Sequence, residues 1–288
     1  MGELGAPAAG DVELSGEAAA GVSREPSGEL VGLGLGERRE FIRREVVKRG
    51  FARIDDLARA LGVSAMTVHR DLDALAEEGW LTKIRGGATA NPSALLEAGV
   101  RERSAALSAE KEAIAARAAR SLSRGQTVFV DDSTTALALH PHLTAAAPLT
   151  VVTNFFPLVR ALGATKGIET LVLGGRYHPL QEACSGLQTT DAIRRLHADV
   201  LFMSTTAVSG GACYHRSEET VAVKRAFMEC ASRSVLLVDH AKFGRRAPHL
   251  LASVEAFDQV ITDEGVDEEE LATLRERGAG VEIAPMSR

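Results

Sequence analysis

The second half of the chain alternates short apolar runs with longer segments that are compatible with helices. The runs are rich in β-branched residues and lie at 127–130, 149–153, 170–173, 199–203, 234–238 and 258–262. Runs of this length suit strands that are buried on both faces, as in a parallel sheet covered by helices. The alternation therefore predicts an α/β domain with a mostly parallel sheet, which an alanine-rich helix over 110–123 precedes.

Polar residues follow five of these runs directly. Ligands of such domains bind at the carboxyl ends of the strands, where hydroxyls and backbone N–H groups at a strand-to-helix turn can hold a phosphate. Arg176 and Lys242 could add positive charge, while Asp131 and Asn154 could accept hydrogen bonds from a sugar. A Ser-Thr-Thr turn taken singly is more often a plain helix cap. The predicted effector-binding residues are Asp131, Asp132, Ser133, Thr134, Thr135, Asn154, Gly174, Gly175, Arg176, Thr205 and Lys242.

Residues 51–89 show a different periodicity, that of two short amphipathic helices. The apolar positions are Ile54, Leu57, Ala58 and Leu61 in the first helix, and Val68, Leu72 and Leu75 in the second. Gly62 ends the first helix and Ser64 is a natural N-cap for the second. This pattern predicts a helix-turn-helix whose second helix enters the DNA major groove. A helix from Glu37 to about Lys48 is expected to complete a three-helix unit.

The side chains expected to contact DNA follow from the orientation of the second helix. With Val68 and Leu72 inward, Met66 and Arg70 point outward and Thr67 and His69 lie on the flanks. Asp71 lies nearer the inward side and is expected to pair with an arginine of the first helix. Residues 81–89 predict a small β wing with a reversal at two glycines, and Trp80 is expected to anchor it to the core. The predicted DNA-binding residues are Ser64, Met66, Thr67, His69, Arg70, Lys83 and Arg85.

The segment Val63 to Leu72 resembles the signature of the DeoR family of bacterial transcription regulators, V-S-x-x-T-I-R-R-D-L. The departure is His69, where the family usually has arginine. The second half resembles the family's sensor domain, which is similar to ribose-5-phosphate isomerase, glucosamine-phosphate isomerase and CoA transferases. The matching motifs are D-S-G-T-T at 131–135, T-N at 153–154, G-G at 174–175 and D-x-x-K at 239–242.

This resemblance covers about 37–285 and implies a DNA-binding regulator, more often a repressor, of sugar or carbohydrate metabolism genes. The effector that it implies is a phosphorylated sugar or related metabolite. Ser133 replaces the glycine of the family's turn, and Ser204 and Ala207 occupy further positions where the family usually has glycine. The added side chains are expected to narrow the pocket and to select an unusual ligand.

Charge is distributed unevenly along the chain, whose net charge is −6. Residues 1–36 carry one basic and six acidic residues, and residues 37–89 carry 11 basic and nine acidic ones. The weak positive charge of the second segment favours a homodimer or homotetramer on double-stranded DNA. The expected organisation is a disordered tail over 1–36, a winged helix-turn-helix domain over 37–90, a partly helical linker over 91–108 and an effector-sensing domain over 109–288.

Several kinds of protein are disfavoured by what the chain contains. The three cysteines lack paired CxxC spacing, and the histidines lack the ligand spacing of a metal site, so neither a metal nor a cofactor is expected. No apolar run reaches the length of a membrane span and the N-terminus does not resemble a secretory signal, which favours a cytoplasmic protein with reduced thiols.

Two alternatives to a regulator remain open at this point. One is a sugar-phosphate isomerase or CoA-transferase-like enzyme fused to a DNA-binding domain, in which Asp131, Asp132 and Lys242 would do acid–base work. The other is an interaction module whose winged helix binds protein rather than DNA.

Overall fold

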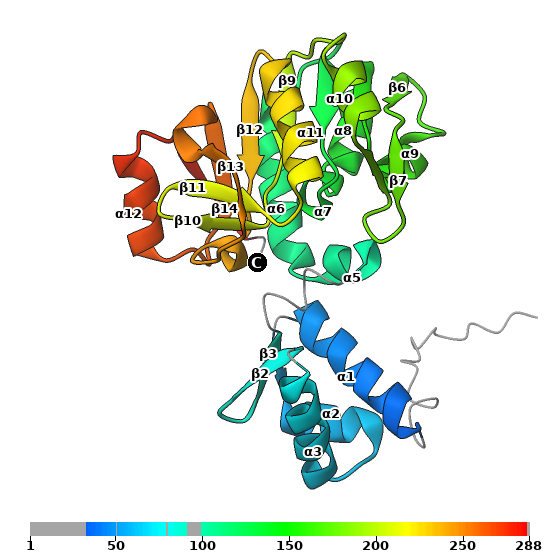
Figure 1. Ribbon diagram of the computed structural model, residues 1–288, viewed down its shortest axis with the longest axis vertical. Helices are drawn as coiled ribbons and strands as arrows, with labels where there is room; N and C mark the ends of the chain where they lie inside the picture. Colours follow the sequence, from blue (N-terminus) through cyan, green and yellow to red (C-terminus); the bar gives the residue numbers. More distant parts are fainter. Residues whose placement is uncertain (1–32, 50, 79, 91–98, 287–288) are drawn as a thin grey trace, which may run out of the picture.

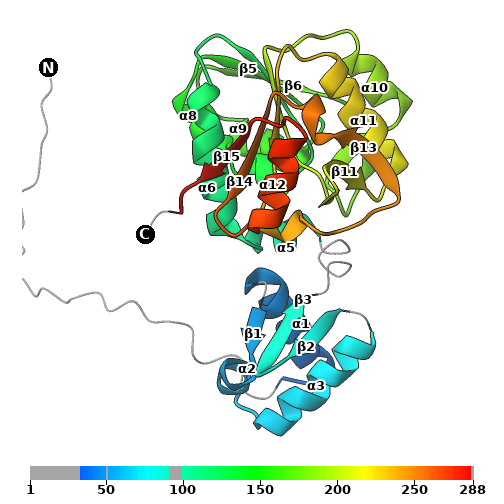
Figure 2. The same ribbon diagram turned by 90° about the vertical axis from the view of Figure 1, so that its left-hand side faces the viewer.

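The computed structural model describes residues 33–49, 51–78, 80–90 and 99–286 (Figure 1). Two units follow one another along the chain, a small N-terminal one and a larger C-terminal one, and both views separate them (Figure 2). The predicted disordered tail and linker fall largely on residues 1–32 and 91–98, which lie outside the described residues. None of the described helices is long and apolar enough to cross a membrane.

The N-terminal unit consists of three helices and a small antiparallel sheet with the strand order β1-β3-β2. Its elements are α1 (Leu35–Arg49), β1 (Phe51–Arg53), α2 (Ile54–Leu61), α3 (Ala65–Glu77), β2 (Leu81–Ile84) and β3 (Gly87–Ala90). The predicted helix-turn-helix and wing are confirmed, and β1 is an additional strand that pairs with β3. Helix α1 begins two residues before the predicted start at Glu37, within the predicted tail, because the Glu37 carboxylate accepts a hydrogen bond from the Gly34 N–H (3.0 Å).

The C-terminal unit is built on a seven-stranded parallel sheet with the strand order β15-β14-β12-β9-β4-β5-β6. Its strands are β4 (Thr127–Val130), β5 (Leu149–Thr153), β6 (Ile168–Val172), β9 (Val200–Met203), β12 (Ser234–Leu237), β14 (Gln259–Asp263) and β15 (Val281–Ala284). The six apolar runs are all strands of this sheet, so the predicted α/β fold class is confirmed. The edge strand β15 was not anticipated, because it is largely half-buried and has Glu282 in its middle.

Helices cover both faces of this sheet. One face carries α6 (Ser108–Ala118), α7 (Thr134–Leu137), α8 (His140–Ala145) and α9 (Phe156–Leu162), and the other carries α10 (Leu187–Ile193), α11 (Glu218–Glu229) and α12 (Glu268–Glu276). Successive strand residues point to opposite faces, so Val128 and Val130 enter one core and Phe129 enters the other. Burial on both faces explains why the strands read as continuous apolar runs.

Shorter elements complete this unit. They are the hairpin of β7 (Arg176–His178) and β8 (Ala183–Ser185), the sheet of β10 (Ala207–Ser209), β11 (Ala212–His215) and β13 (His249–Ser253), and the short helices η1 (Ala119–Ser121), η2 (His240–Lys242) and η3 (Val254–Ala256). Helix α5 (Val100–Ala105) precedes α6 and contacts both α7 and α1 of the N-terminal unit (Figure 1). It therefore stands between the two units.

Candidate functional site

A cavity of about 230 Å³ opens at the carboxyl ends of β4, β9 and β12. Drug-sized ligands occupy pockets of roughly 300–1,000 Å³, so this volume suits a small metabolite. The lining side chains are predominantly hydroxyls and cations. They come from α5, the start of α6, the turns after the three strands, the β7–β8 hairpin, the end of β11 and the start of α11. The charged members are Arg103, Lys111, Asp132, Arg216, Asp239, Lys242 and Arg245.

Six of the predicted effector residues line this cavity: Asp132, Ser133, Thr134, Thr135, Thr205 and Lys242. They follow β4, β9 and β12, which are neighbours in the sheet. The other five, Asp131, Asn154, Gly174, Gly175 and Arg176, do not contribute to its wall. Four of those five follow β5 and β6, at the far end of the sheet from β12.

The residues after β5 and β6 hold neighbouring segments in place. The Asn154 side-chain amide donates to the Cys184 carbonyl (2.8 Å), which fixes β8 against the end of β5. Thr189 donates to the Gly174 carbonyl (2.8 Å) from α10. A Cβ atom on Gly175, whose φ is +147°, would lie 2.1 Å from the Thr189 hydroxyl. These glycines therefore permit close packing of α10 on the sheet edge.

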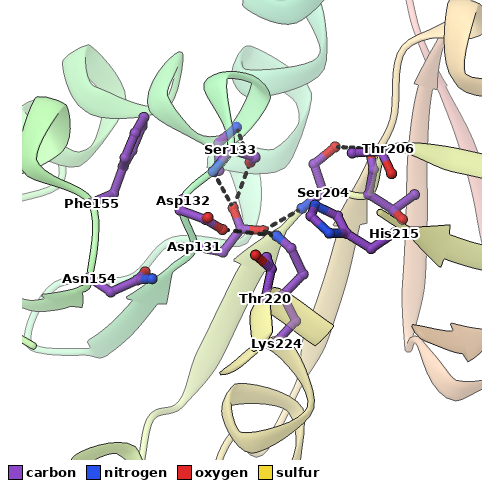
Figure 3. A network of polar contacts seen from close by, with 12 residues as sticks. Asp131, Asp132, Ser133, Asn154, Phe155, Ser204, Thr206, His215, Thr220 and Lys224 are labelled. Carbon is purple, nitrogen blue, oxygen red and sulfur yellow. Dashed lines mark hydrogen bonds and ion pairs between the residues drawn. The ribbon is translucent and has the colours of Figure 1, made fainter. Parts of the chain in front are cut away.

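Asp131 lies beneath the cavity and is completely buried. Its Oδ1 accepts from the N–H and hydroxyl of Ser133 (3.0 and 2.5 Å), and its Oδ2 accepts from the Ser204 N–H (2.9 Å) and from Lys224. Figure 3 shows Lys224 reaching from α11 to this carboxylate. Both carboxylate oxygens are thus engaged within the protein, and Asp131 ties β4, β9 and α11 together.

Asp132 shares Lys224 with Asp131, at 3.2 Å, and faces the cavity. Burial alone would raise the pKa of Asp132, but Lys224 and His215 lower it, so the net shift is downward. Burial and Lys224 lower the pKa of His215 to about 4, so its imidazole is neutral near pH 7. The Ser217 N–H donates to Nδ1 of His215 (3.1 Å), which leaves Nε2 to carry the proton.

Two arginines and two lysines gather at the side of the cavity next to α5. They are Arg103, Lys111, Lys242 and Arg245. Burial, together with the nearby Lys242 and Arg103, lowers the pKa of Lys111 to about 8, against the opposing influence of Asp239. The pKa of Lys242 is likewise lowered by burial and by its neighbours Arg245 and Arg103. These four residues, the basic cluster, therefore make this side of the cavity strongly positive.

The β7–β8 hairpin is fastened to α11 at the rim. Arg176 pairs with Glu219 (3.1 Å), and the Ser185 hydroxyl donates to the other oxygen of the same carboxylate (2.9 Å). His178 lies 2.7 Å from the Ser185 hydroxyl and lines the cavity. Arg176 is thus a rim residue that is paired within the chain.

The titratable residues of this site that were not among the predicted effector residues include Arg103, Lys111, His215, Arg216, Lys224, Asp239 and Arg245. Helical periodicity carried a signal for Lys224, because it lies three residues after Val221 and three before Phe227 and so shares their buried face. Nothing local distinguishes Arg103, which lies in α5, from the exposed Arg101 on the same helix.

The predicted recognition helix α3 buries Val68, Leu72 and Leu75 and exposes Met66 and Arg70. Arg70 makes no ion pair within the residues that the structure describes. The Ser64 hydroxyl accepts from the Thr67 N–H (3.1 Å) and lies 2.9 Å from the Thr67 hydroxyl, so the predicted N-cap is confirmed. His69 is half-buried on the flank of the helix.

Asp71 is buried and pairs with Arg38 (2.6 Å) and Arg39 (3.3 Å) of α1, which confirms its predicted structural role. In the wing, Lys83 pairs with Asp73 of α3 (2.5 Å), whereas Arg85 is exposed. Trp80 is half-buried against the core and carries the Arg43 guanidinium 4.1 Å from its ring centroid, as expected for an anchor. The wing is therefore held to α3 through Lys83 and to α1 through the neighbouring Trp80.

Within the described residues, no group of three or more His, Cys, Asp or Glu side chains is arranged to hold a metal ion. All three cysteines are free thiols, and Cys184 and Cys213 are buried.

Comparisons with known proteins agree with this two-part organisation. The family model described as a DeoR-like helix-turn-helix domain matches residues 38–94, and the model described as the DeoR C terminal sensor domain matches residues 107–264. In fold, the chain has a partial likeness to ribose 5-phosphate isomerase A from Methanocaldococcus jannaschii, with a TM-score of 0.34 and 14% identity over 46% of this chain and 53% of that one.

Curated relatives match both units together and are described as transcription regulators, several of them as repressors. A putative aga operon transcriptional repressor of Escherichia coli O157:H7 is 29% identical over 265 residues, which cover 90% of this chain and 97% of the relative. The glycerol-3-phosphate regulon repressor of Escherichia coli strain K12 is 31% identical over 221 residues, 76% of this chain and 87% of the relative. The chain therefore belongs to the DeoR family of transcription regulators, in which a DNA-binding helix-turn-helix domain precedes a C-terminal sensor domain.

Proposed function

We propose that this regulator is a repressor whose affinity for DNA is controlled by a small phosphorylated sugar or related metabolite in the cavity at the ends of β4, β9 and β12. In this proposal residues 37–90 bind DNA, 91–108 join the units and 109–288 sense the effector, in the cytoplasm. The relative named as a glycerol-3-phosphate regulon repressor supports a phosphorylated ligand.

The observation that carries this proposal is the charge of the cavity wall. Five cations line it, Arg103, Lys111, Arg216, Lys242 and Arg245, against two carboxylates, Asp132 and Asp239. One of the two carboxylates, Asp132, is already paired with Lys224. In a chain with a net charge of −6, such a concentration of positive charge supports binding of an anion.

The remaining lining groups suit the polyol part of such a ligand. The hydroxyls of Thr205 and Thr206 are oriented by the Tyr214 carbonyl (2.7 and 3.0 Å), and the neutral His215 lies beside Asp132. The Ser133 hydroxyl is engaged with Asp131 and with the Ala136 N–H, so it acts as a helix cap. We therefore assign the effector's hydroxyls to Asp132, Thr205 and their neighbours, and its phosphate to the cations.

A thermal-shift screen tests this assignment. The purified full-length protein is heated with phosphorylated sugars and with the same sugars lacking the phosphate. A ligand at 100 times its Kd adds about 2.7 kcal/mol of stability, which gives a clear rise in melting temperature. Stabilisation by a neutral sugar, with none by any phosphorylated compound, would contradict the proposal.

For DNA, we propose that α3 enters the major groove with Arg70 and Met66 foremost and Ser64, Thr67 and His69 on its flanks. Lys83 and Arg85 of the wing would contact the phosphate backbone. Arg70→Ala should weaken binding to fragments selected from the genome by the wild-type protein by at least tenfold in fluorescence anisotropy. Unchanged affinity would contradict this arrangement and favour a protein-binding winged helix.

We further propose that the protein binds DNA as a homodimer or homotetramer. Five exposed large apolar residues, Leu171, Val172, Tyr177, Leu180 and Leu187, come from the single stretch 171–187 and suit a subunit contact. Light scattering of the chromatographed protein at micromolar concentration tests this point, and a monomeric mass would refute it.

A further inference from the structure

Two guanidinium groups of the basic cluster have N–H donors that no described residue satisfies. Arg103 comes from α5, and Arg245 comes from the connection between η2 and β13. Nη2 of Arg103 and Nη1 of Arg245 are both buried and lack a hydrogen-bond acceptor among the described residues. Buried donors are almost always satisfied in proteins, so two orphans lining one cavity indicate an acceptor that arrives with a ligand.

The charges around these arginines indicate what kind of acceptor that is. Burial lowers the pKa values of Lys111, Lys242 and Arg245, and Asp239 opposes this shift at all three, whereas at Arg103 the opposing carboxylates are Asp132 and Asp131, followed by Glu102 and Glu182. Lys242 makes no ion pair within the part of the chain that the structure describes. Burial, Arg245 and Arg103 all disfavour the protonated form of its side chain. Asp239 alone cannot neutralise Lys111, Lys242 and Arg245, and the buried carboxylates nearest Arg103, Asp131 and Asp132, are already paired with Lys224. An added dianion with several acceptor oxygens would satisfy both the excess positive charge and the orphan donors.

We propose that Arg103 and Arg245 together bind the phosphate group of the effector. Helix α5 therefore supplies an effector contact, although it lies before residues 107–264, which the family model of the sensor domain matches. This inference rests on the proposed function, in which the cavity binds a phosphorylated metabolite. Arginine suits this role because its planar fork donates two parallel hydrogen bonds to phosphate oxygens.

The same contact links the effector to the DNA-binding unit. The Lys111 ammonium donates to the carbonyls of Arg103 and Ala106 (2.7 Å for Ala106), which ties the end of α5 to α6. Helix α5 in turn contacts α1, the first helix of the DNA-binding unit (Figures 1 and 2). A phosphate that holds Arg103 therefore fixes α5 against the sensor domain and constrains the start of the connection to α1.

Isothermal titration of the full-length protein tests the two arginines. The probes are inorganic phosphate, ribose 5-phosphate and neutral ribose at constant ionic strength. Arg103→Gln and Arg245→Gln should each weaken binding of both phosphate probes by at least tenfold, because each loses a charge-assisted pair of hydrogen bonds. The matched controls are Arg101→Gln and Arg246→Gln, exposed arginines beside each position, which should bind within twofold of wild type.

The outcomes separate this inference from the function on which it rests. If the wild type binds neither phosphate probe, both are overturned. If it binds them and both glutamine variants bind equally well, only the role of the arginines is overturned. Circular dichroism checks that each variant is folded, and if Arg103→Gln is not, Arg245→Gln decides.

Hydrogen exchange tests the link through α5. Phosphate should slow amide exchange at least fivefold within Val100–Ala105 in the wild type and in Arg101→Gln, but not in Arg103→Gln. Phosphate binding that leaves exchange in α5 unchanged in the wild type would overturn the proposed link.

Discussion

Asp71 is a buried charge on a helix whose opposite face is expected to meet DNA. Two arginines of α1 hold its carboxylate, which fixes the rotation of α3 about its axis. That rotation places Arg70, the next residue back, on the exposed side. A single ion-pair cluster thus sets which side chains the helix presents.

Asp71→Ala should destabilise the DNA-binding unit by about 1–3 kcal/mol, below the 3–5 kcal/mol typical of a broken buried pair because the arginines are partly exposed. Urea unfolding followed by circular dichroism measures the change. Asp73→Ala on the same helix is the control, since it breaks only the exposed pair with Lys83 and should cost less than about 1 kcal/mol. Equal effects would contradict the structural role of Asp71.

His215 predicts how the sensor domain responds to acid. Its pKa falls from 6.5 to about 4 on folding because of burial and the nearby Lys224. The unfolded chain therefore takes up the proton first, so the stability that His215 contributes above pH 6.5 is lost as the pH falls toward 4. The predicted loss is on the order of 1–3 kcal/mol. In the wild type it contributes to the difference between the free energies of unfolding measured in urea at pH 7 and at pH 5, and His215→Gln should abolish this contribution. An imidazole that titrates near 6.5 by NMR would disprove this.

At the scale of elements, the site depends on contacts between segments far apart in the chain. Lys224 of α11 is 93 residues from Asp131 at the end of β4, yet their ion pair fastens the helix to the sheet beneath the cavity (Figure 3). The Ser204 N–H joins the end of β9 to the same carboxylate. This network gives the floor of the cavity a fixed shape.

Lys224→Met should destabilise the sensor domain by about 3–5 kcal/mol, because it leaves Asp131 and Asp132 as buried carboxylates without a cation. The control is Lys166→Met, the same substitution at an exposed lysine, which should change the free energy of unfolding by less than about 0.5 kcal/mol. Chemical denaturation of both variants measures the difference. A tolerated Lys224→Met would show that the network is not a structural requirement.

At the scale of the whole molecule, the two units have separate hydrophobic cores. The core of the N-terminal unit draws on residues between Leu33 and Ala88, while both cores of the sensor domain draw on residues from Val100 onward. A contact between α1 and α5 joins the units, without a shared core cluster among the described residues. Units built this way unfold independently unless their interface is large.

Calorimetry of the full-length protein should therefore show two transitions. A phosphorylated ligand should raise only the transition of the sensor domain, and Asp71→Ala should lower only that of the DNA-binding unit. A single transition that both changes shift by the same amount would indicate one cooperative unit instead.

Local patterns in the sequence determined the elements of this protein. Apolar runs marked six of the seven strands of the parallel sheet, and helical periodicity with a glycine stop and a serine cap marked the helix-turn-helix. Both signals depend on neighbours within a few residues, so they can be read along the chain. The alternation of strands and helices also predicted a ligand site at the carboxyl ends of the strands, which is where the cavity opens.

Only the tertiary structure decided which polar residues share the cavity. The sheet order brings the turns after β4, β9 and β12 together and leaves those after β5 and β6 to pack against β8 and α10. It also brings Arg103 and Arg245, 142 positions apart, to one wall. Their proximity depends on strand order and on packing between distant segments, which no local pattern records.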